Sequence, residues 1–462
     1  MLNQKLANKV NESSPPLSRE FQLIQSLQQK GQLKAASEIS NLLEQIQENY
    51  QKIHGYKNWI NKYRQMHESR LSKLLLRMHK KVKGGVSLIG GLLYKSVVVS
   101  LSAIVRFHSK GDIWLIGERV DQAEDNGFEF FKYCREHYPH RRIFYVIDPN
   151  SNDILKINHY GNIIYHSTFK HHVYVLAAEK YISAWTFKES LLPRNFNKLF
   201  GSSDRLRKKK NICLQHGVII HNISPYMHKD IYNIDYLLCS SEKEKEIIKS
   251  TLGYSDEEIL VTGLARFDNL VNANPKRQIL VMPTWRRYLA NKSRELFESS
   301  TFFETYRQLL TNQRLIKLLD QFSYELVFYL HHNFQKYSSS FKLDSERITV
   351  VDSRLTSAAS LIQSSAILIT DYSSVASDFV YMNRPVLFYQ FDSYHNHHSP
   401  IEEIEYSDLG NVAETEEDLF RQLEQWFTTR VEDDQLEERR ALLFNNVDAN
   451  NCSRIFASVD KI

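Results

Sequence analysis

Cysteine is scarce in this sequence, which has four in 462 residues: Cys134, Cys213, Cys239 and Cys452. No two of them form a CxxC motif, so the spacing indicates neither a zinc site nor a disulfide framework. A chain that does not depend on disulfides is typical of a reducing compartment. We therefore expect a cytoplasmic protein.

Long hydrophobic runs are also lacking. The first residues contain no apolar core of the signal-peptide type. The most apolar stretch, residues 86–105, carries Lys95 at its centre and is diluted by glycine and serine, which argues against a membrane span. Because basic residues lie just upstream, segment 77–106 fits a helix on the cytoplasmic membrane surface, and it fits an interdomain packing helix equally well.

A strong charge imbalance is absent too. The formal net charge is +5, which is mild for this length, and we expect no nucleic-acid partner. Local basic clusters lie at 77–83 and 205–210. Each is either a solvated face or an attraction site for anionic lipid headgroups or a polyanionic product.

The pattern of apolar residues indicates the organisation of the chain. Residues 1–17 are expected to be disordered, and residues 18–110 form a helical N-terminal region with apolar positions three to four apart. From residue 112 short apolar runs alternate with helical stretches, a pattern typical of parallel, doubly wound sheets. The polar segment 272–277 separates two such series. We predict an α/β protein with two Rossmann-like domains facing a cleft, a first (acceptor) domain at 111–271 and a second (donor) domain at 272–462.

The predicted strands share a short apolar core that often ends in a polar or glycine residue. In the first series they are 112–117, 142–148, 162–167, 180–185, 211–217 and 236–241, and in the second 278–285, 324–332, 347–352, 366–374 and 385–392. Ligands of such folds bind at the carboxyl ends of the strands. Strand ends are therefore the places to look for chemistry.

Two histidine motifs follow predicted strands. His216 precedes Gly217, which allows a tight turn and close approach of a ligand, and its side chain can exchange protons near neutral pH. His331 and His332 end another strand, and only one of the two points toward the cleft because neighbouring strand residues point opposite ways. Taken alone, each motif fits a packing or surface histidine as well.

Two further motifs offer anion-binding groups. Thr284 and Arg286 end the first strand of the second series, and a guanidinium matches a phosphate in a bidentate way. Ser373 and Ser374 follow Asp371 where a helix is expected to begin, so hydroxyls and free N–H groups would meet an anion there. The alternative is that Ser374 only caps this helix.

These motifs, in this order, resemble the CDP-glycerol glycerophosphotransferase family, which builds teichoic acids and related poly(polyol-phosphate) capsules. The resemblance covers about 112–445 and includes "ERVDQAEDNGFEFFKY", "LQHG", "VTGLARFDNL", "ILVMPTWR", "LHH" and "LITDYSSVASDFVYMNRPVLFY". It implies a fold of the glycosyltransferase-B type. It also implies a CDP-activated donor, CDP-glycerol or CDP-ribitol, and a polymer or lipid-linked acceptor.

The resemblance also implies residue roles. His216 would be the base for the acceptor hydroxyl, and His331 would contact the donor phosphate or protonate the leaving group. The pyrophosphate would be held by Arg286, Ser373 and Ser374, in a pocket shaped by Thr284 and Asp371. Further candidates are Gly217, His332 and Arg266.

No metal or other cofactor is required by these motifs, although Mg²⁺ would be compatible with them, and a homo-oligomer is compatible as well. The reaction would transfer polyol phosphate to a polymer hydroxyl and release CMP. Two alternatives stay open at this stage. One is a nucleotide-sugar glycosyltransferase or epimerase of the same fold, and the other is a non-catalytic scaffold for capsule assembly.

Overall fold

The computed structural model describes residues 88–109, 111–202, 206, 208–351, 356–396, 399–429 and 434–462. The predicted disordered segment 1–17, the predicted helices of 18–80 and the basic cluster at 77–83 lie outside the described residues. Residues 91–462 form one unit that contains both sheets.

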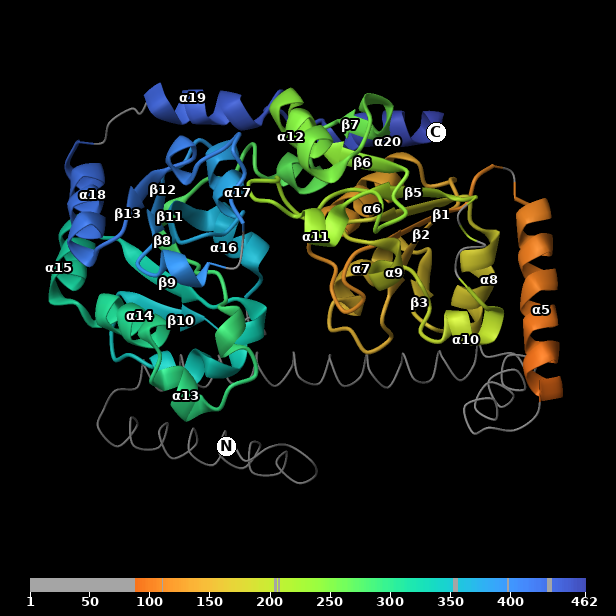
Figure 1. Cartoon of the computed structure of the whole chain (residues 1–462), viewed down its shortest axis with the longest axis horizontal. Helices are drawn as coiled ribbons and strands as arrows, with labels where there is room; N and C mark the ends of the chain where they lie inside the picture. Colours follow the sequence, from red (N-terminus) through yellow and green to blue (C-terminus); the bar gives the residue numbers. More distant parts are fainter. Residues whose placement is uncertain are drawn as a thin grey trace, which may run out of the picture. The chain divides into compact units, whose positions relative to one another are not determined.

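The first sheet has seven parallel strands in the order β3-β2-β1-β4-β5-β6-β7 (Figure 1). In its centre Trp114 pairs with Ile143 on one side and with Lys180 on the other. Its innermost strands are buried along their whole length, as expected for a parallel sheet covered on both faces. The strands are β1 (Trp114–Gly117), β2 (Ile143–Ile147), β3 (Ile163–Tyr165), β4 (Lys180–Ser183), β5 (Lys210–Cys213), β6 (Tyr236–Cys239) and β7 (Ile259–Val261).

The second sheet has six parallel strands in the order β10-β9-β8-β11-β12-β13. Leu368 pairs with Leu280 and with Val386, which fixes the register of the three central strands. The strands are β8 (Lys276–Val281), β9 (Glu325–Tyr329), β10 (Ile348–Val351), β11 (Ser365–Thr370), β12 (Val386–Tyr389) and β13 (Asn411–Ala413).

Helices connect the strands, and several begin at a Ser, Thr or Asn whose side chain accepts a backbone N–H, for example Thr168, Ser241 and Ser300. The α-helices are α5 (Leu88–Phe107), α6 (Asn126–His137), α7 (Ile154–Ile157), α8 (Phe169–Ala177), α9 (Phe187–Ser190), α10 (Phe196–Phe200), α11 (Ser224–Met227), α12 (Glu242–Leu252), α13 (Arg294–Glu298), α14 (Thr301–Thr311), α15 (Gln313–Phe322), α16 (Ala358–Ser364), α17 (Ala376–Tyr381), α18 (Glu416–Thr429), α19 (Asp434–Leu443) and α20 (Asn451–Lys461). Two 3₁₀ helices bear on the site, η4 (Ala265–Asn269) and η6 (His332–Phe341).

Both sheets reverse their strand order once, between β1 and β4 in the first and between β8 and β11 in the second. The loops that follow these strands lie at the switch points where doubly wound folds bind ligands. In the first sheet they begin with Glu118 and Ala184, and in the second they contain Thr284 and Asp371. The fold confirms the predicted class. The three-residue edge strands β7 and β13 were not among the strands predicted from the sequence.

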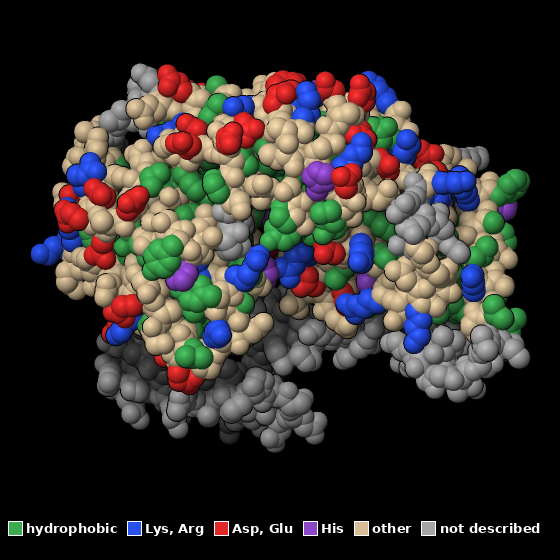
Figure 2. Space-filling view, viewed as in Figure 1, with side chains coloured by type: hydrophobic (Ala, Val, Ile, Leu, Met, Phe, Trp, Pro, Cys, Tyr) green, Lys and Arg blue, Asp and Glu red, His purple; other side chains and the backbone are tan. Residues whose placement is uncertain are grey.

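Helix α5 covers the stretch in which a membrane segment was considered. Tyr94 and Val98 are buried against the first sheet's elements, whereas Leu92, Ile104 and Phe107 are exposed. Hydrophobic side chains reach the surface along α5, at the right edge of Figure 2. Among the described residues, no helix is long and apolar enough to cross a membrane.

The C-terminal helix α20 packs on the first half of the molecule. It lies against α6 and η4, and Phe456 stacks on Tyr138 with ring centroids 3.7 Å apart. Figure 1 labels α20 at the C-terminal end of the chain. Asp268 of η4 accepts the backbone N–H groups of Asn451 and Cys452 at 2.8 and 2.9 Å. The sequence assigned this helix to the second Rossmann-like domain, whereas these contacts place it on the first.

Candidate functional site

His216 lies in the loop after β5. Its side chain is 65% exposed, while the preceding Gln215 is buried and has a left-handed backbone (φ 65°), which is rare for a residue other than glycine. Asn126, the first residue of α6, donates from its side chain to the Gln215 carbonyl at 2.9 Å. The side chain of Asn126 therefore holds the backbone of this loop, and the His216 imidazole projects from the loop toward solvent.

Asp125 holds His216 in one orientation, with 2.6 Å between Asp125 Oδ2 and His216 Nδ1. Burial opposes ionisation of Asp125, but the neighbouring His216 and Arg266 outweigh it and lower the pKa of this carboxyl. An ionised carboxylate only accepts hydrogen bonds, so Nδ1 carries the proton in this contact. In the neutral imidazole Nε2 is then the basic nitrogen, which is the arrangement of a general base.

Glu118 places Asp125 at the start of α6. Its buried carboxylate follows β1 and accepts the N–H groups of Glu124, Asp125 and Phe128 at 2.6, 3.1 and 2.9 Å. Burial raises the pKa of Glu118 to about 8, the nearby Asp125 adds to the increase, and the backbone N–H groups oppose it. Gly127 permits this packing, because a Cβ there would lie 2.7 Å from the Gly117 carbonyl oxygen.

Arg266 joins the His216 loop to the second sheet's half. Its guanidinium pairs with Asp125 at 3.0 Å and with Asp378 of α17 at 2.7 Å, and it donates to the His216 carbonyl at 2.5 Å. Burial lowers the pKa of Arg266, but the two carboxylates outweigh this and raise it further above its ordinary value. Gly217 lies nearby, and a Cβ on it would be 3.2 Å from Ser374 Oγ. The structure thus brings His216, Gly217, Arg266 and Ser374 together.

The stretch after β11 forms the turn that leads into α17. Ser373 Oγ accepts the N–H of Val375 at 3.3 Å, and α17 begins at Ala376, with no side-chain cap from its N-cap residue Val375. The Ser373 and Ser374 carbonyls accept the N–H groups of Ala376 and Ser377 at 3.3 and 3.0 Å. Both serines are half-buried and lie where the helix begins.

Arg286 is enclosed by protein and has no exposed surface. Its guanidinium pairs with Asp392 through two bonds of 2.8 and 2.7 Å and with Asp371 at 2.8 Å, between the rings of Phe302 and Tyr372. Burial opposes its charge, but these carboxylates raise the pKa of Arg286 above its ordinary value. The positive charge of Arg286, which was expected to bind a phosphate, is therefore already paired with the carboxylates of Asp371 and Asp392.

Asp371 and Thr284 belong to the same buried cluster. Asp371 accepts the N–H groups of Thr284 and Tyr372 at 2.8 and 2.6 Å, which ties the ends of β8 and β11 together. Thr284 Oγ1 is buried and has no hydrogen-bond partner among the described residues. The Thr284 hydroxyl is therefore available to donate a hydrogen bond to a ligand at the switch point of the second sheet.

His331 and His332 differ in their surroundings. The His331 ring is half-buried and stacks on Trp285 with centroids 6.1 Å apart. His332 retains exposed surface, yet the protein around its ring lowers its pKa to about 4, first through desolvation and then through Arg119 and His216, with Asp121 opposing. His332 is therefore neutral at neutral pH.

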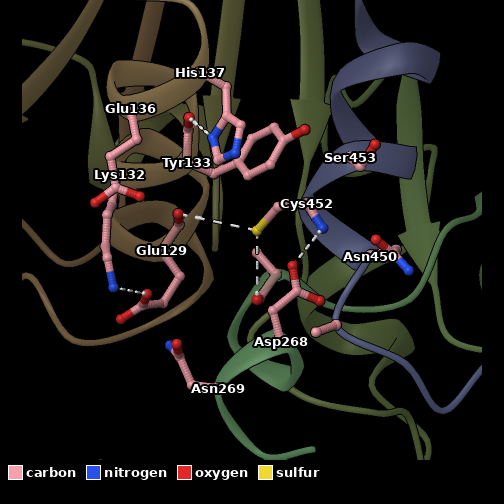
Figure 3. A pocket seen from close by; sticks show the side chains of 12 residues that line it. Glu129, Lys132, Tyr133, Glu136, His137, Asp268, Asn269, Asn450, Cys452 and Ser453 are labelled. Carbon is pink, nitrogen blue, oxygen red and sulfur yellow. Dashed lines mark hydrogen bonds and ion pairs between the residues drawn. The ribbon is translucent and has the colours of Figure 1, made fainter.

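A pocket of about 310 Å³ lies behind this network, between α6, η4 and the start of α20 (Figure 3). Figure 3 shows Lys132 and Glu129 on one wall and Asp268 holding the Cys452 N–H on the other. None of the predicted site residues lines it. The pocket is therefore separate from the predicted site residues, although α6 and η4 contribute to both.

The cysteines and clustered acids of the described residues offer no further site. All four cysteines are free and buried. Within the part of the chain that the structure describes, no group of three or more His, Cys, Asp or Glu side chains could hold a metal ion.

Asp125, Asn126, Glu118 and Asp378 were not singled out from the sequence. The first three lie in the stretch "ERVDQAEDNG", where an acid follows a buried strand and two polar residues precede a helix. That position is the available sequence signal, because a strand-end acid can reach a neighbouring loop. Asp378 lies in "SSVASDF", where nothing local indicates a partner 112 residues away.

Two parallel, doubly wound sheets with polar loops at their switch points define the glycosyltransferase-B class of fold. The wall teichoic acid polymerase TagF shares this fold, with a TM-score of 0.58 and 18% identity over 84% of this chain and 97% of that chain. A family model described as CDP-glycerol:poly(glycerophosphate) glycerophosphotransferase matches residues 98–461, and the chain belongs to this family.

Curated relatives come from teichoic acid synthesis. The minor teichoic acid biosynthesis protein GgaB of Bacillus subtilis (strain 168) is 29% identical over 432 residues, which cover 89% of this chain and 46% of that protein. The teichoic acid glycerol-phosphate primase of the same organism is 30% identical over 174 residues, which cover 34% of this chain and 40% of that protein. The chain thus spans less than half the length of these relatives.

Proposed function

We propose that this chain transfers a polyol phosphate from a CDP-activated donor to a hydroxyl of a growing cell-surface polymer and releases CMP. CDP-glycerol is the first candidate donor and CDP-ribitol the second. The observation that carries the proposal is His216, whose Nδ1 is held by the ionised Asp125, while a Cβ on Gly217 of the same loop would lie 3.2 Å from Ser374 Oγ. Family membership supports the reaction type.

In the proposed reaction Nε2 of His216 takes the proton of the acceptor hydroxyl. The hydroxyl oxygen bonds to the phosphorus that carries the polyol, the bond between that phosphorus and the oxygen it shares with CMP breaks, and CMP leaves with that oxygen. Ser373, Ser374 and the Thr284 hydroxyl donate to the donor's pyrophosphate, where charge accumulates. His331 contacts the donor phosphate or protonates the leaving group. Mg²⁺ is compatible with this scheme but no residue is assigned to it.

Arg286 and Asp371 take a positioning role in this proposal. Arg286 is fully buried among carboxylates. Asp371 binds the backbone of Thr284 and Tyr372. Together they shape the loops that carry Thr284, Ser373 and Ser374, so they act on the donor through these loops.

The proposal is tested by CMP release from purified protein supplied with CDP-glycerol or CDP-ribitol and an oligomeric primer. His216→Ala is expected to lower kcat by about 10²–10⁴. The matched control is His140→Ala, an exposed histidine of the first half. Absence of CMP release from both donors refutes the substrate class and favours a scaffold, whereas a His216→Ala variant that releases CMP at the wild-type rate removes His216 from the role of base.

We further propose that α5 brings the enzyme to the cytoplasmic face of the membrane. Its exposed side presents Leu92, Leu93 and Phe107. Co-sedimentation with anionic vesicles should fall several-fold when Leu92, Leu93 and Phe107 are replaced by Ser. Equal sedimentation of both proteins contradicts the proposal.

A further inference from the structure

Trp185 is a large aromatic residue beside His216 that the proposed chemistry leaves without a role. It follows β4, the strand next to β1 at the switch point of the first sheet. Its ring lies 5.7 Å from the His216 ring, at an angle of 87°. The imidazole therefore meets the indole at an edge and does not stack on it.

The backbone around Trp185 is fixed. Ser183 Oγ donates to the Trp185 carbonyl at 2.9 Å, and the Ala184 N–H donates to the Gly117 carbonyl at 3.1 Å. Residue 185 thus stays in register with the strand that ends at Gly117, from which Glu118 and Asp125 follow. The indole is placed by the same scaffold that places the base.

Packing accounts for this indole only in part, because Trp185 is half-buried. Burying a tryptophan stabilises a fold strongly, and that stabilisation is only partly used here. A rigid aromatic face next to a catalytic base is instead a common feature of small-ligand sites.

We propose that Trp185 is the platform for the acceptor. The C–H face of the terminal polyol or sugar unit packs on the indole, and its hydroxyl edge is turned to Nε2 of His216. The acceptor is assigned because Trp185 and His216 both belong to the first sheet, whereas Thr284, Ser373 and Ser374, assigned to the donor, follow strands of the second. This inference rests on the proposed function.

The kinetic test compares Trp185→Ala, Trp185→Phe and the control Trp426→Ala in CMP release. Trp426 is also half-buried but packs on Tyr324 in the second half. Trp185→Ala is expected to raise the KM for primer at least about tenfold, with kcat and the KM for donor within about threefold of wild type. Trp185→Phe keeps an aromatic face and should stay within about threefold, as should the control.

Two primers separate the sources of the acceptor unit. A larger loss on a primer ending in a sugar ring assigns the platform to a sugar, and a larger loss on a polyol-phosphate primer assigns it to a polyol. Either result supports the platform. An unchanged primer KM on both, in variants that release CMP normally, overturns it.

A binding test does not need turnover. Titrating the full chain with primer and no donor should quench tryptophan fluorescence in the wild type and in Trp426→Phe, but not in Trp185→Phe. Quenching that survives in Trp185→Phe overturns the platform. If the wild type releases no CMP but shows Trp185-dependent quenching, the proposed reaction fails while acceptor binding stands.

Discussion

A single carboxylate decides which nitrogen of His216 is free to act. Asp125 Oδ2 lies 2.6 Å from Nδ1, and His216 and Arg266 keep the pKa of Asp125 low despite its burial. In the proposed reaction the charge of Asp125 also stabilises the imidazolium that forms when Nε2 takes a proton. Asparagine at position 125 would keep the shape of the side chain but would neither fix the proton on Nδ1 nor stabilise the imidazolium.

Asp125→Asn should therefore lower kcat by about 10²–10⁴ with little change in the KM for donor. The measurement is CMP release under saturating donor, with circular dichroism to confirm folding. Asp460→Asn, which alters an exposed ion pair with Arg141, serves as the control. A rate close to that of wild type would remove Asp125 from the mechanism.

The charge of Arg286 is paired with buried carboxylates and is therefore not free to bind a phosphate. Replacing it by Met should lower the free energy of unfolding by about 3–5 kcal/mol, because Asp371 and Asp392 would keep buried charges without a partner. Urea unfolding measures this loss. Wild-type stability combined with a raised KM for donor would restore the direct phosphate role.

The sequence identified His216 correctly as a strand-end histidine, but it did not reveal Asp125, which lies 91 residues away. The same limit applies to Arg286, whose partner Asp392 lies 106 residues away. Local pattern shows where a strand ends and which side chain follows. It does not show which side chain from another strand end meets it, so the roles of these residues stay predictions.

At the scale of elements, the junction of β1 and α6 positions Glu118 and Asp125. Gly127→Ala would force a Cβ to 2.7 Å from the Gly117 carbonyl oxygen and 3.1 Å from Glu118 Oε2. We expect a loss of about 1–3 kcal/mol in urea unfolding, together with reduced kcat as Asp125 shifts. Gly91→Ala in α5 has open space and should be neutral or stabilising by up to about 1 kcal/mol. Equal behaviour of both variants contradicts the proposed packing constraint.

Glu118 makes this junction sensitive to pH. Its pKa is raised from 4.5 to about 8 in the folded chain, so between these values the folded state binds a proton that the unfolded state has released. Its contribution to the free energy of unfolding therefore falls as pH rises from about 4.5 to 8. Glu118→Gln should show a shallower decline in urea unfolding between pH 5 and 8.5. Identical slopes would contradict the raised pKa.

Most strands were predictable because buried parallel strands are short, nearly continuous apolar runs. Sequence pattern predicted β1 and β11 at the observed places, but not the edge strands β7 and β13. It also placed Ser373 and Ser374 where a helix begins, and their carbonyls accept the N–H groups of Ala376 and Ser377 at the start of α17.

At the scale of the whole molecule, Arg266 and Asp378 connect the two halves by a buried ion pair of 2.7 Å. A double-mutant cycle with Arg266→Met and Asp378→Asn should give a coupling energy of about 1–3 kcal/mol in urea unfolding. Both single variants should also lower kcat, because Arg266 supports Asp125 and the His216 loop. Additive effects on stability would show that the pair does not link the halves.

The return of α20 to the first half has a consequence for synthesis. Trp114, which Phe456 and Arg141 cover, lies in the first strand of the first sheet. A ribosome reaches Phe456 only after completing the second sheet, roughly 10 s or more after the first sheet has been made. Until then the nascent first half exposes an aromatic surface, and we expect it to depend on chaperones longer than the second half does.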